Sequence, residues 1–263
     1  MKKRLIFLIA LFFVSLVSFS SATFAWFTDQ YNPSVDSLKF NVATQEYLMI
    51  SKTGVAGSFK DNISFSELVS GDVTLKPVSA EVTENSISLM DGQNSAIANN
   101  NYIMFSLYFS SSNDMEVYLE GSSSGTVVDP IKIDNNIFTD EQVNKIVNSI
   151  RVGFIAYSTR EVPTSSGIDI IYDPIDTHIY SVNEKIDSSY KDGLKPYETF
   201  YNIGRSEIVD DVVLLDVTSN KVSKMDIYIW LESEDVSCDE SIFNSPLQIN
   251  LRFKAVKIEE ADN

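Results

Sequence analysis

His178 and Cys238 are the only histidine and the only cysteine of the 263-residue chain, which limits the chemistry that its side chains can perform. Catalytic zinc sites commonly combine two or three imidazoles with a general-base carboxylate, so an H-E-x-x-H peptidase motif cannot form. The lone histidine lies in the segment DTHIY, residues 176–180, and we expect an ordinary surface histidine in a loop or strand. A lone cysteine cannot form an intramolecular disulfide.

We identify no residue in the sequence as a catalytic nucleophile. Asp235, Asp239 and Glu240 flank Cys238, and such an acidic neighbourhood raises the pKa of a thiol and disfavours the reactive thiolate. We identify no nucleophile elbow and no glycine-rich phosphate loop, because the letters GSSSG at residues 121–125 belong to a turn-forming stretch between predicted strands. We therefore predict a protein that is not an enzyme, with no catalytic residue and no cofactor.

Carboxylates are the abundant candidate ligands, with 37 Asp and Glu in the chain. Ca²⁺ is a hard cation that binds oxygen ligands, and two groups of acids could hold it, although neither matches an EF-hand loop. We favour solvated acidic faces and no bound metal, with Ca²⁺ binding as the alternative. A carboxylate pair for glycoside hydrolysis needs a cleft geometry that sequence does not reveal. The two groups are Glu232, Glu234, Asp235, Asp239 and Glu240, and Asp169, Asp173 and Asp176.

The composition is that of a folded globular chain, with 44% hydrophobic and 22% charged residues. The 37 acids outnumber the 20 Lys and Arg, and the formal net charge is -17. A groove for nucleic acid would have to form against this negative field, so we exclude nucleic acid as a partner.

The N-terminus has the pattern of a secretory signal peptide. The basic letters KKR precede residues 5–28, which contain no charged residue and begin with an apolar run. Thr23 and Ala25 are small residues at the spacing that a signal peptidase accepts, which places cleavage before Trp26. We therefore predict a signal peptide over residues 1–25. Its loss removes three basic residues and changes the net charge from -17 to -20.

An uncleaved membrane anchor is the alternative for this segment, since about 20 apolar residues suffice to span a bilayer. From Ser15 onwards, serine and threonine residues lower the hydrophobicity of the segment, as in the region before a cleavage site. We therefore favour cleavage. No cysteine stands near the cut to receive a lipid, and residues 258–263 are not an apolar sorting tail. We expect membrane contact only through the signal peptide before cleavage, and a secreted product in the extracellular matrix or at the cell surface.

Two short motifs carry a resemblance to a known family. Residues 21–29, SATFAWFTD, resemble the junction of exported proteins processed by a SipW-type signal peptidase, the group that contains TasA and camelysin. Residues 227–238, IYIWLESEDVSC, are similar to the WLEGEDPxC segment of many such proteins, with Ser233 for the usual Gly and Val236 for the usual Pro. Five of the matching positions of this C-terminal motif are singled out, namely Trp230, Leu231, Glu232, Asp235 and Cys238.

The resemblance implies a jelly roll exported by a Gram-positive-type cell with a SipW-type signal peptidase as its partner. It also implies that the mature N-terminal segment can enter the next subunit as an added strand, so that a fibre grows head to tail. Camelysin-like proteins have been classed as metallopeptidases. We rank that activity last among the alternatives, because this chain lacks the imidazole ligands.

The alternation of apolar and polar residues predicts a mainly β fold by itself, independently of the family resemblance. Four runs place apolar residues on one face at the two-residue period of a half-buried strand. These runs are residues 38–43, 115–120, 226–231 and 247–254. Residues 102–109 and 150–157 are largely apolar on both faces, which suits central strands covered on both sides.

Turn-forming stretches such as residues 163–167 separate the runs, and one helix is clear. It covers residues 140–149, where Thr139 can cap the first turn and Gln142 can complete a capping box. We therefore predict a two-sheet β-sandwich, jelly-roll-like as the resemblance implies, with one short helix. The predicted organisation is a signal peptide over 1–25, an extended segment over 26–37 and a single β-sandwich domain over 38–263.

The mature N-terminus is the candidate contact surface. Trp26, Phe27 and Tyr31 follow the cut directly, and exposed aromatic rings are typical of a segment that binds another surface. An extended segment can complete an open sheet edge through main-chain hydrogen bonds while alternate side chains fill pockets. Such a contact does not close on itself, so it yields a filament. The alternative is that the segment folds back onto its own domain.

We therefore predict an exported structural protein, a fibre-forming subunit of the biofilm matrix or cell surface that assembles by N-terminal strand donation. The expected partners are further copies of the chain in a homo-oligomer or filament. A monomeric surface adhesin or a Ca²⁺-dependent carbohydrate-binding module is the alternative from the binding class.

Overall fold

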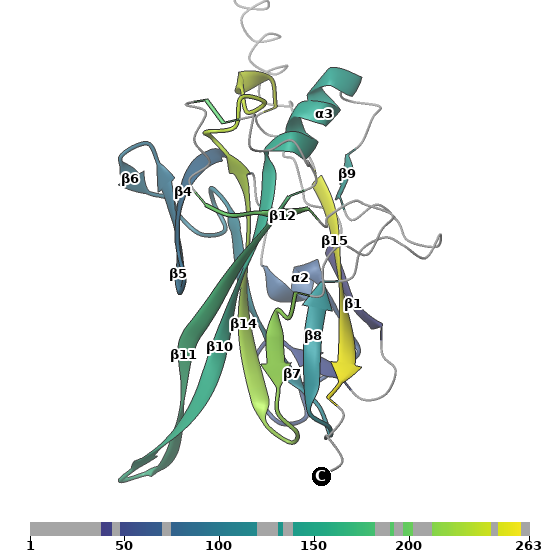
Figure 1. The fold of residues 1–263 in the computed structure, drawn as a ribbon, viewed down its shortest axis with the longest axis vertical. Coiled ribbons are helices and arrows are strands. Elements are labelled where there is room, and N and C mark those ends of the chain that lie inside the picture. The colour runs from purple at the N-terminus through teal and green to yellow at the C-terminus, as the bar shows by residue number, and fades with distance from the viewer. Residues whose placement is uncertain are drawn as a thin grey trace, which may run out of the picture. The chain divides into compact units, whose positions relative to one another are not determined.

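The computed structural model describes residues 38–43, 48–69, 75–119, 131–133, 139–181, 190–191, 197–201, 212–242 and 247–258. These residues belong to one unit of the chain, Pro33–Asn263, and they are mainly β (Figure 1). The predicted signal peptide and the segment 26–37 lie outside the described residues.

One sheet has six strands in the order β13-β8-β15-β1-β3, with β9 also beside β15. β1 runs parallel to β15, and Phe40 is the register partner of Leu251. The first and last strands of the described chain are therefore neighbours in this sheet, on the right of Figure 1. The bounds are β1 Leu38–Ala43, β3 Asn62–Ser64, β8 Met115–Leu119, β9 Ile131–Ile133, β13 Leu215–Val217 and β15 Leu247–Lys257.

The other sheet has nine strands in the order β12-β11-β10-β14-β4-β5-β6, with β7 also beside β14 and β2 beside β7. β14 lies at its centre, because it pairs with β10 along one edge and with β7 and β4 along the other. The bounds are β2 Met49–Ser51, β4 Pro77–Thr83, β5 Ser86–Asp91, β6 Asn94–Ser95, β7 Ile103–Ser110, β10 Ile150–Thr164, β11 Gly167–Ser181, β12 Phe200–Tyr201 and β14 Val222–Glu232.

The two sheets enclose a common apolar core. Phe253 of β15 contacts Phe109 and Phe154 of the nine-stranded sheet, with ring centroids 5.6 and 6.1 Å apart. Each fully buried side chain of this kind contributes about 1.5–3 kcal/mol relative to an exposed one. β14 turns alternate residues into the core, as its sequence pattern predicts. They are Met225, Ile227, Ile229 and Leu231.

A second apolar cluster lies on the opposite face of the nine-stranded sheet. The hairpin of β4 and β5 folds over β10 and β11 and covers Trp230, which is fully buried. Ile87 of β5 approaches so closely that a Cβ on Gly153 would lie 2.5 Å from its Cδ1 atom. Glycine at this position lets the hairpin pack against the sheet. The expectation of a single core face for residues 227–231 is therefore wrong, because the hairpin creates a second one.

β10 and β7 differ in how far their outward faces are covered. β10 is buried on both faces from Ile150 to Ala156, as expected for a central strand. On β7 the residues facing away from the core, Met104, Ser106 and Tyr108, are only half-buried. The expectation that both faces of residues 102–109 are covered is therefore wrong for β7.

The predicted helix is present as α3, Asp140–Ser149, with its capping box. The Thr139 hydroxyl accepts a hydrogen bond from the Gln142 backbone N–H, and the Gln142 side chain accepts one from the Thr139 N–H. A four-residue helix, α2 Phe65–Leu68, and a 3₁₀ turn, η2 Glu240–Ile242, were not expected. Both are about one turn long, too short to give a helical period in the sequence.

β10 and β11 form a long hairpin that the sequence did not indicate. Residues 163–167 were expected to be a loop, but the strands pair up to Thr164 and Gly167, which leaves only Ser165 and Ser166 in the turn. Each strand has 15 residues. The end of the hairpin extends past the neighbouring strands of its sheet, at the lower left of Figure 1.

Candidate functional site

The five residues singled out in the C-terminal motif are buried. Trp230, Leu231, Glu232, Asp235 and Cys238 have exposed fractions of 0, 1, 0, 0 and 7%. They occupy the end of β14 and the turn that follows it. Residues with so little accessible surface can contact only the fold around them, so their contacts within the protein indicate their role.

Glu232 joins the end of β14 to the second apolar cluster. Its Oε2 atom accepts hydrogen bonds from Tyr197 Oη at 2.6 Å and Trp230 Nε1 at 3.1 Å. Its Oε1 atom accepts one from the backbone N–H of Glu234 at 3.2 Å. Burial raises the pKa of Glu232, and the hydrogen bonds from Tyr197 and Trp230 oppose that rise. The carboxyl group therefore holds the Trp230 indole and the following turn in place.

Asp235 neutralises a buried arginine. Arg151 Nη2 lies 2.8 Å from Asp235 Oδ2, and both side chains are 0% exposed. Arg151 Nη1 also donates to the carbonyl oxygens of Asn148 and Ile150, and the Tyr190 ring centroid lies 5.8 Å from the guanidinium carbon. The sequence showed Arg151 only as an interruption of an apolar run. The structure supplies its partner from 84 positions away.

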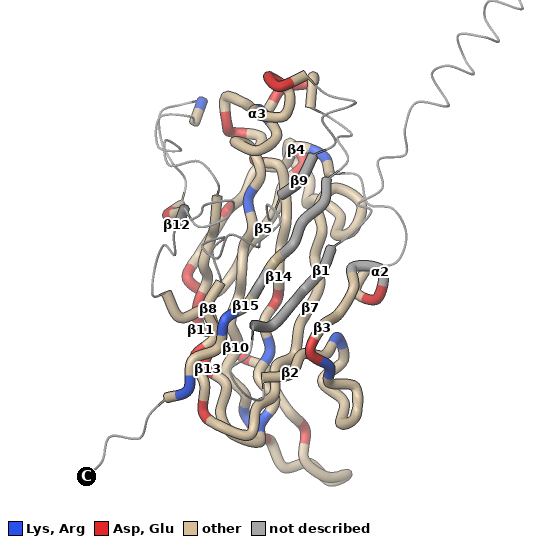
Figure 2. Tube along the Cα trace, turned by 90° about the vertical axis from the view of Figure 1, so that its right-hand side faces the viewer, with Lys and Arg blue, Asp and Glu red and all other residues tan. Residues whose placement is uncertain are grey.

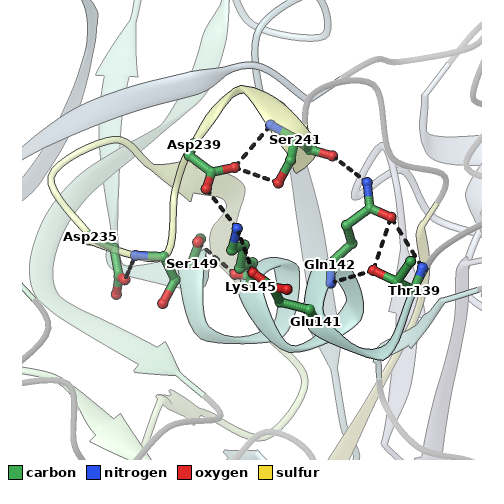
Figure 3. Close-up of polar contacts among 9 residues, drawn as sticks. Thr139, Glu141, Gln142, Lys145, Ser149, Asp235, Asp239 and Ser241 are labelled. Atoms are coloured by element: carbon green, nitrogen blue, oxygen red, sulfur yellow. Dashed lines mark hydrogen bonds and ion pairs between the residues drawn. The ribbon is translucent and has the colours of Figure 1, made fainter.

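Helix α3 fixes the turn that carries Asp239 (Figure 3). Lys145 Nζ lies 2.8 Å from Asp239 Oδ2 and 3.1 Å from Glu141 Oε1. Gln142 Nε2 donates to the carbonyl oxygen of Ser241 at 2.9 Å. The hydrogen bond from Lys145, together with those from the Ser241 hydroxyl and backbone N–H, lowers the pKa of Asp239 to about 2. The helix thus ties down the chain that follows the C-terminal motif.

Five of the eight acids considered for Ca²⁺ are engaged in the following contacts. Glu232, Asp235 and Asp239 accept the hydrogen bonds described above. Asp173 lies 3.0 Å from Arg160, and Asp176 lies 3.2 Å from His178. Within the described ranges, no group of three or more His, Cys, Asp and Glu could hold a metal ion.

His178 is not the surface histidine that the sequence suggested. It belongs to β11, its side chain is 12% exposed, and its ring centroid lies 5.8 Å from that of Phe200. The cause is the strand register, because its partner on β10 is the core residue Phe154. Burial lowers the pKa of His178, and Asp176 opposes that shift.

Cys238 is expected to be unreactive in the folded protein. Burial, helped by Glu232 and Asp235 and opposed by Lys191, raises the pKa of its thiol to about 12. The direction matches the sequence prediction, although burial is the larger cause. At about pH 8 the folded protein should react with Ellman's reagent more than about a hundredfold slower than the protein unfolded in guanidinium chloride, because only the thiolate reacts. Equal rates in the two states would contradict this assignment.

The accessible candidate site is the outer edge of β11. β12 pairs with β11 only at Tyr180 and Ser181. Among the described residues, the stretch from Gly167 to Ile179 therefore pairs on the β10 side alone. Ile168 and Ile170 on this stretch are 63 and 47% exposed. An unpaired edge with exposed apolar side chains can accept a further strand through main-chain hydrogen bonds.

The remaining site residues predicted from the sequence lie outside the described residues. They are Thr23, Ala25, Trp26, Phe27 and Tyr31. In the part of the chain that the structure describes, no helix is both long and apolar enough to cross a bilayer. Comparisons with protein-family models, curated proteins and solved structures find no match. The resemblance to TasA and camelysin therefore stays a prediction from two short motifs.

Proposed function

We propose that the protein is an exported, non-enzymatic structural subunit that assembles into fibres of the extracellular matrix or cell surface. In this proposal its fold is a jelly-roll-like β-sandwich, and residues 26–37 of one copy pair with β11 of the next. The observation that carries the proposal is the edge from Gly167 to Ile179, which has no second partner strand among the described residues and exposes Ile168 and Ile170.

The lengths of the two segments support this pairing. Residues 26–37 would span about 40 Å when extended at roughly 3.3 Å per residue, and a 15-residue strand such as β11 spans about 50 Å. Trp26, Phe27 and Tyr31 would then supply aromatic side chains to pack against Ile168 and Ile170. Donor and acceptor are different surfaces of the same chain, so the contact propagates head to tail into a filament.

Charge sets the conditions for assembly. The receiving strand carries Asp169, Asp173 and Asp176, and the donor segment carries Asp29 and Asp36. Figure 2 shows Lys and Arg interspersed with Asp and Glu along the described strands. The repulsion between the acids of neighbouring copies is therefore not concentrated on one strand. At about 0.1 M ionic strength, salt largely screens the repulsion between exposed charges that are more than about 10 Å apart. Assembly should therefore accelerate as salt is added.

Truncation of the donor segment tests the proposal. A chain beginning at Trp26 should form filaments at moderate ionic strength, whereas a chain beginning at Ser37 should stay monomeric. Size-exclusion chromatography and negative-stain microscopy of both chains across a range of ionic strength measure this difference. Matched thermal melts control for folding. Monomers of both chains at every ionic strength would contradict strand donation and favour the monomeric binding protein instead.

A further inference from the structure

Five half-buried tyrosines gather on the face of the nine-stranded sheet that points away from the common core. We call this surface the tyrosine face. They come from β7, β10, β11 and β14 and from the residue that precedes β7. β7, β14 and β10 are far apart in the sequence but adjacent in the sheet, and β11 follows β10 directly as the other arm of its hairpin. The residues are Tyr102, Tyr108, Tyr157, Tyr172 and Tyr228.

The rings of the tyrosine face form two pairs. Tyr102 and Tyr228 are stacked, with centroids 6.1 Å apart and an interplanar angle of 16°. Tyr108 and Tyr172 meet edge to face at 5.7 Å. Tyr108 is the register partner of Lys224, which lies four residues before Tyr228 on β14. The two pairs are therefore about 13 Å apart along the strand, at roughly 3.3 Å per residue.

The centre of the tyrosine face is polar but carries no net charge. Asp226 is 3% exposed and accepts hydrogen bonds from Ser106, from Tyr157 Oη at 2.6 Å and from Lys224 Nζ at 3.0 Å. The Lys224 ammonium lies 4.0 Å from the Tyr157 ring centroid, where a cation–π contact holds it. The carboxylate and the ammonium cancel each other's charge. The surrounding phenols remain neutral, because burial raises the pKa of Tyr228 to about 12 and that of Tyr157 as well.

This chemistry fits sugar rings. A half-buried tyrosine presents an apolar ring face and a polar hydroxyl, and both are needed to contact the C–H faces and the hydroxyl groups of a sugar. The absence of net charge at the centre of the face, within a chain of net charge -17, favours an uncharged ligand over an acidic polymer. A separation of about 13 Å between the ring pairs requires a chain longer than a single hexose.

We propose that the tyrosine face binds a neutral polysaccharide chain along the direction of β14. The site is built by the fold alone, so it does not depend on strand donation. If subunits also polymerise, each copy in a filament presents one such face, and a long polysaccharide engages many weak sites at once.

The experiment uses the chain beginning at Trp26 and two kinds of probe. Insoluble cellulose and curdlan are neutral glucans for co-sedimentation, and pectate is an acidic polymer of similar ring size. Cellohexaose, titrated by calorimetry, supplies a dissociation constant. Tyr172→Ala removes one ring of the edge-to-face pair, and Tyr172→Leu keeps apolar volume without the ring. Tyr118→Ala, which removes a half-buried tyrosine of β8 in the other sheet, is the matched control.

We expect retention on at least one neutral glucan, a loss of affinity of about tenfold in both Tyr172 variants and no loss in the Tyr118 variant. Thermal melts of all variants establish that they are folded, and Tyr172→Leu decides the matter if the alanine variant is not. No retention on either neutral glucan, retention on pectate alone, or an equal loss in the Tyr118 variant would each overturn the proposal. If the chain stays monomeric but still binds cellulose, strand donation is contradicted and the polysaccharide proposal is not.

Discussion

Replacement of Asp235 by alanine is expected to lower the free energy of unfolding by about 3–5 kcal/mol, because it leaves a buried charge without its partner. Arg151 would remain 0% exposed, and its guanidinium stays protonated at any pH that the fold survives. The carbonyl oxygens of Asn148 and Ile150 would still accept its Nη1 hydrogen bonds, but they carry no full charge. Urea unfolding followed by circular dichroism and tryptophan fluorescence measures the loss.

Asp173→Ala is the matched control for Asp235→Ala. Asp173 also forms an ion pair with an arginine, because its Oδ2 atom lies 3.0 Å from Arg160 Nε. However, the Asp173 and Arg160 side chains are 48 and 57% exposed. Exposed ion pairs contribute about 0–1 kcal/mol, so the control should change the free energy of unfolding by no more than that. Similar losses in the two variants would show that burial of the Arg151–Asp235 pair does not matter.

Ile168→Lys combined with Ile170→Lys should abolish filament formation, a prediction that rests on the proposed function. Lysines on an edge strand discourage the addition of another strand, and the two isoleucines are exposed apolar side chains of the receiving edge, which also exposes Ile175. Because both are exposed, the free energy of unfolding should change by only about 0.5 kcal/mol per substitution. Negative-stain microscopy scores the filaments, and urea unfolding measures the stability.

The control for this pair is Val55→Lys with Ile97→Lys. These residues are 63 and 62% exposed and do not belong to β11, so the control adds the same charge to equally exposed apolar side chains. Since added lysines reduce the net negative charge, the control should form filaments as readily as the parent chain or more readily. Filaments in neither variant, or in both, would remove the β11 edge from the assembly mechanism.

Elements with a strong local pattern were predictable from the sequence. The helix over residues 140–149 has the bounds of α3, because Thr139 and Gln142 form a capping box that involves only neighbouring residues. The run 38–43 matches β1, the run 115–120 contains β8, and the run 247–254 lies within β15. Alternation at a period of two is a property of each strand by itself, so it is visible before any partner is known.

The role of the C-terminal motif was decided by tertiary structure. The sequence singled out Trp230, Glu232 and Asp235, but their partners Tyr197 and Arg151 are 35 and 84 positions away. Side-chain burial depends on what packs over a strand, and the hairpin of β4 and β5 covers Trp230 in a way that its own segment does not encode. The motif therefore gives the identity of these residues, while their function as a buried polar network follows from the fold.

The sequence by itself determined the β-rich class, the helix α3 and the shortage of catalytic ligands, because local periodicity and residue counts do not depend on which segments meet. Tertiary structure alone decided the long β10–β11 hairpin, the buried Arg151–Asp235 pair, the inward position of His178 and the tyrosine face. Each of these features depends on strand register, which brings together residues distant in the chain and fixes the face to which every side chain points.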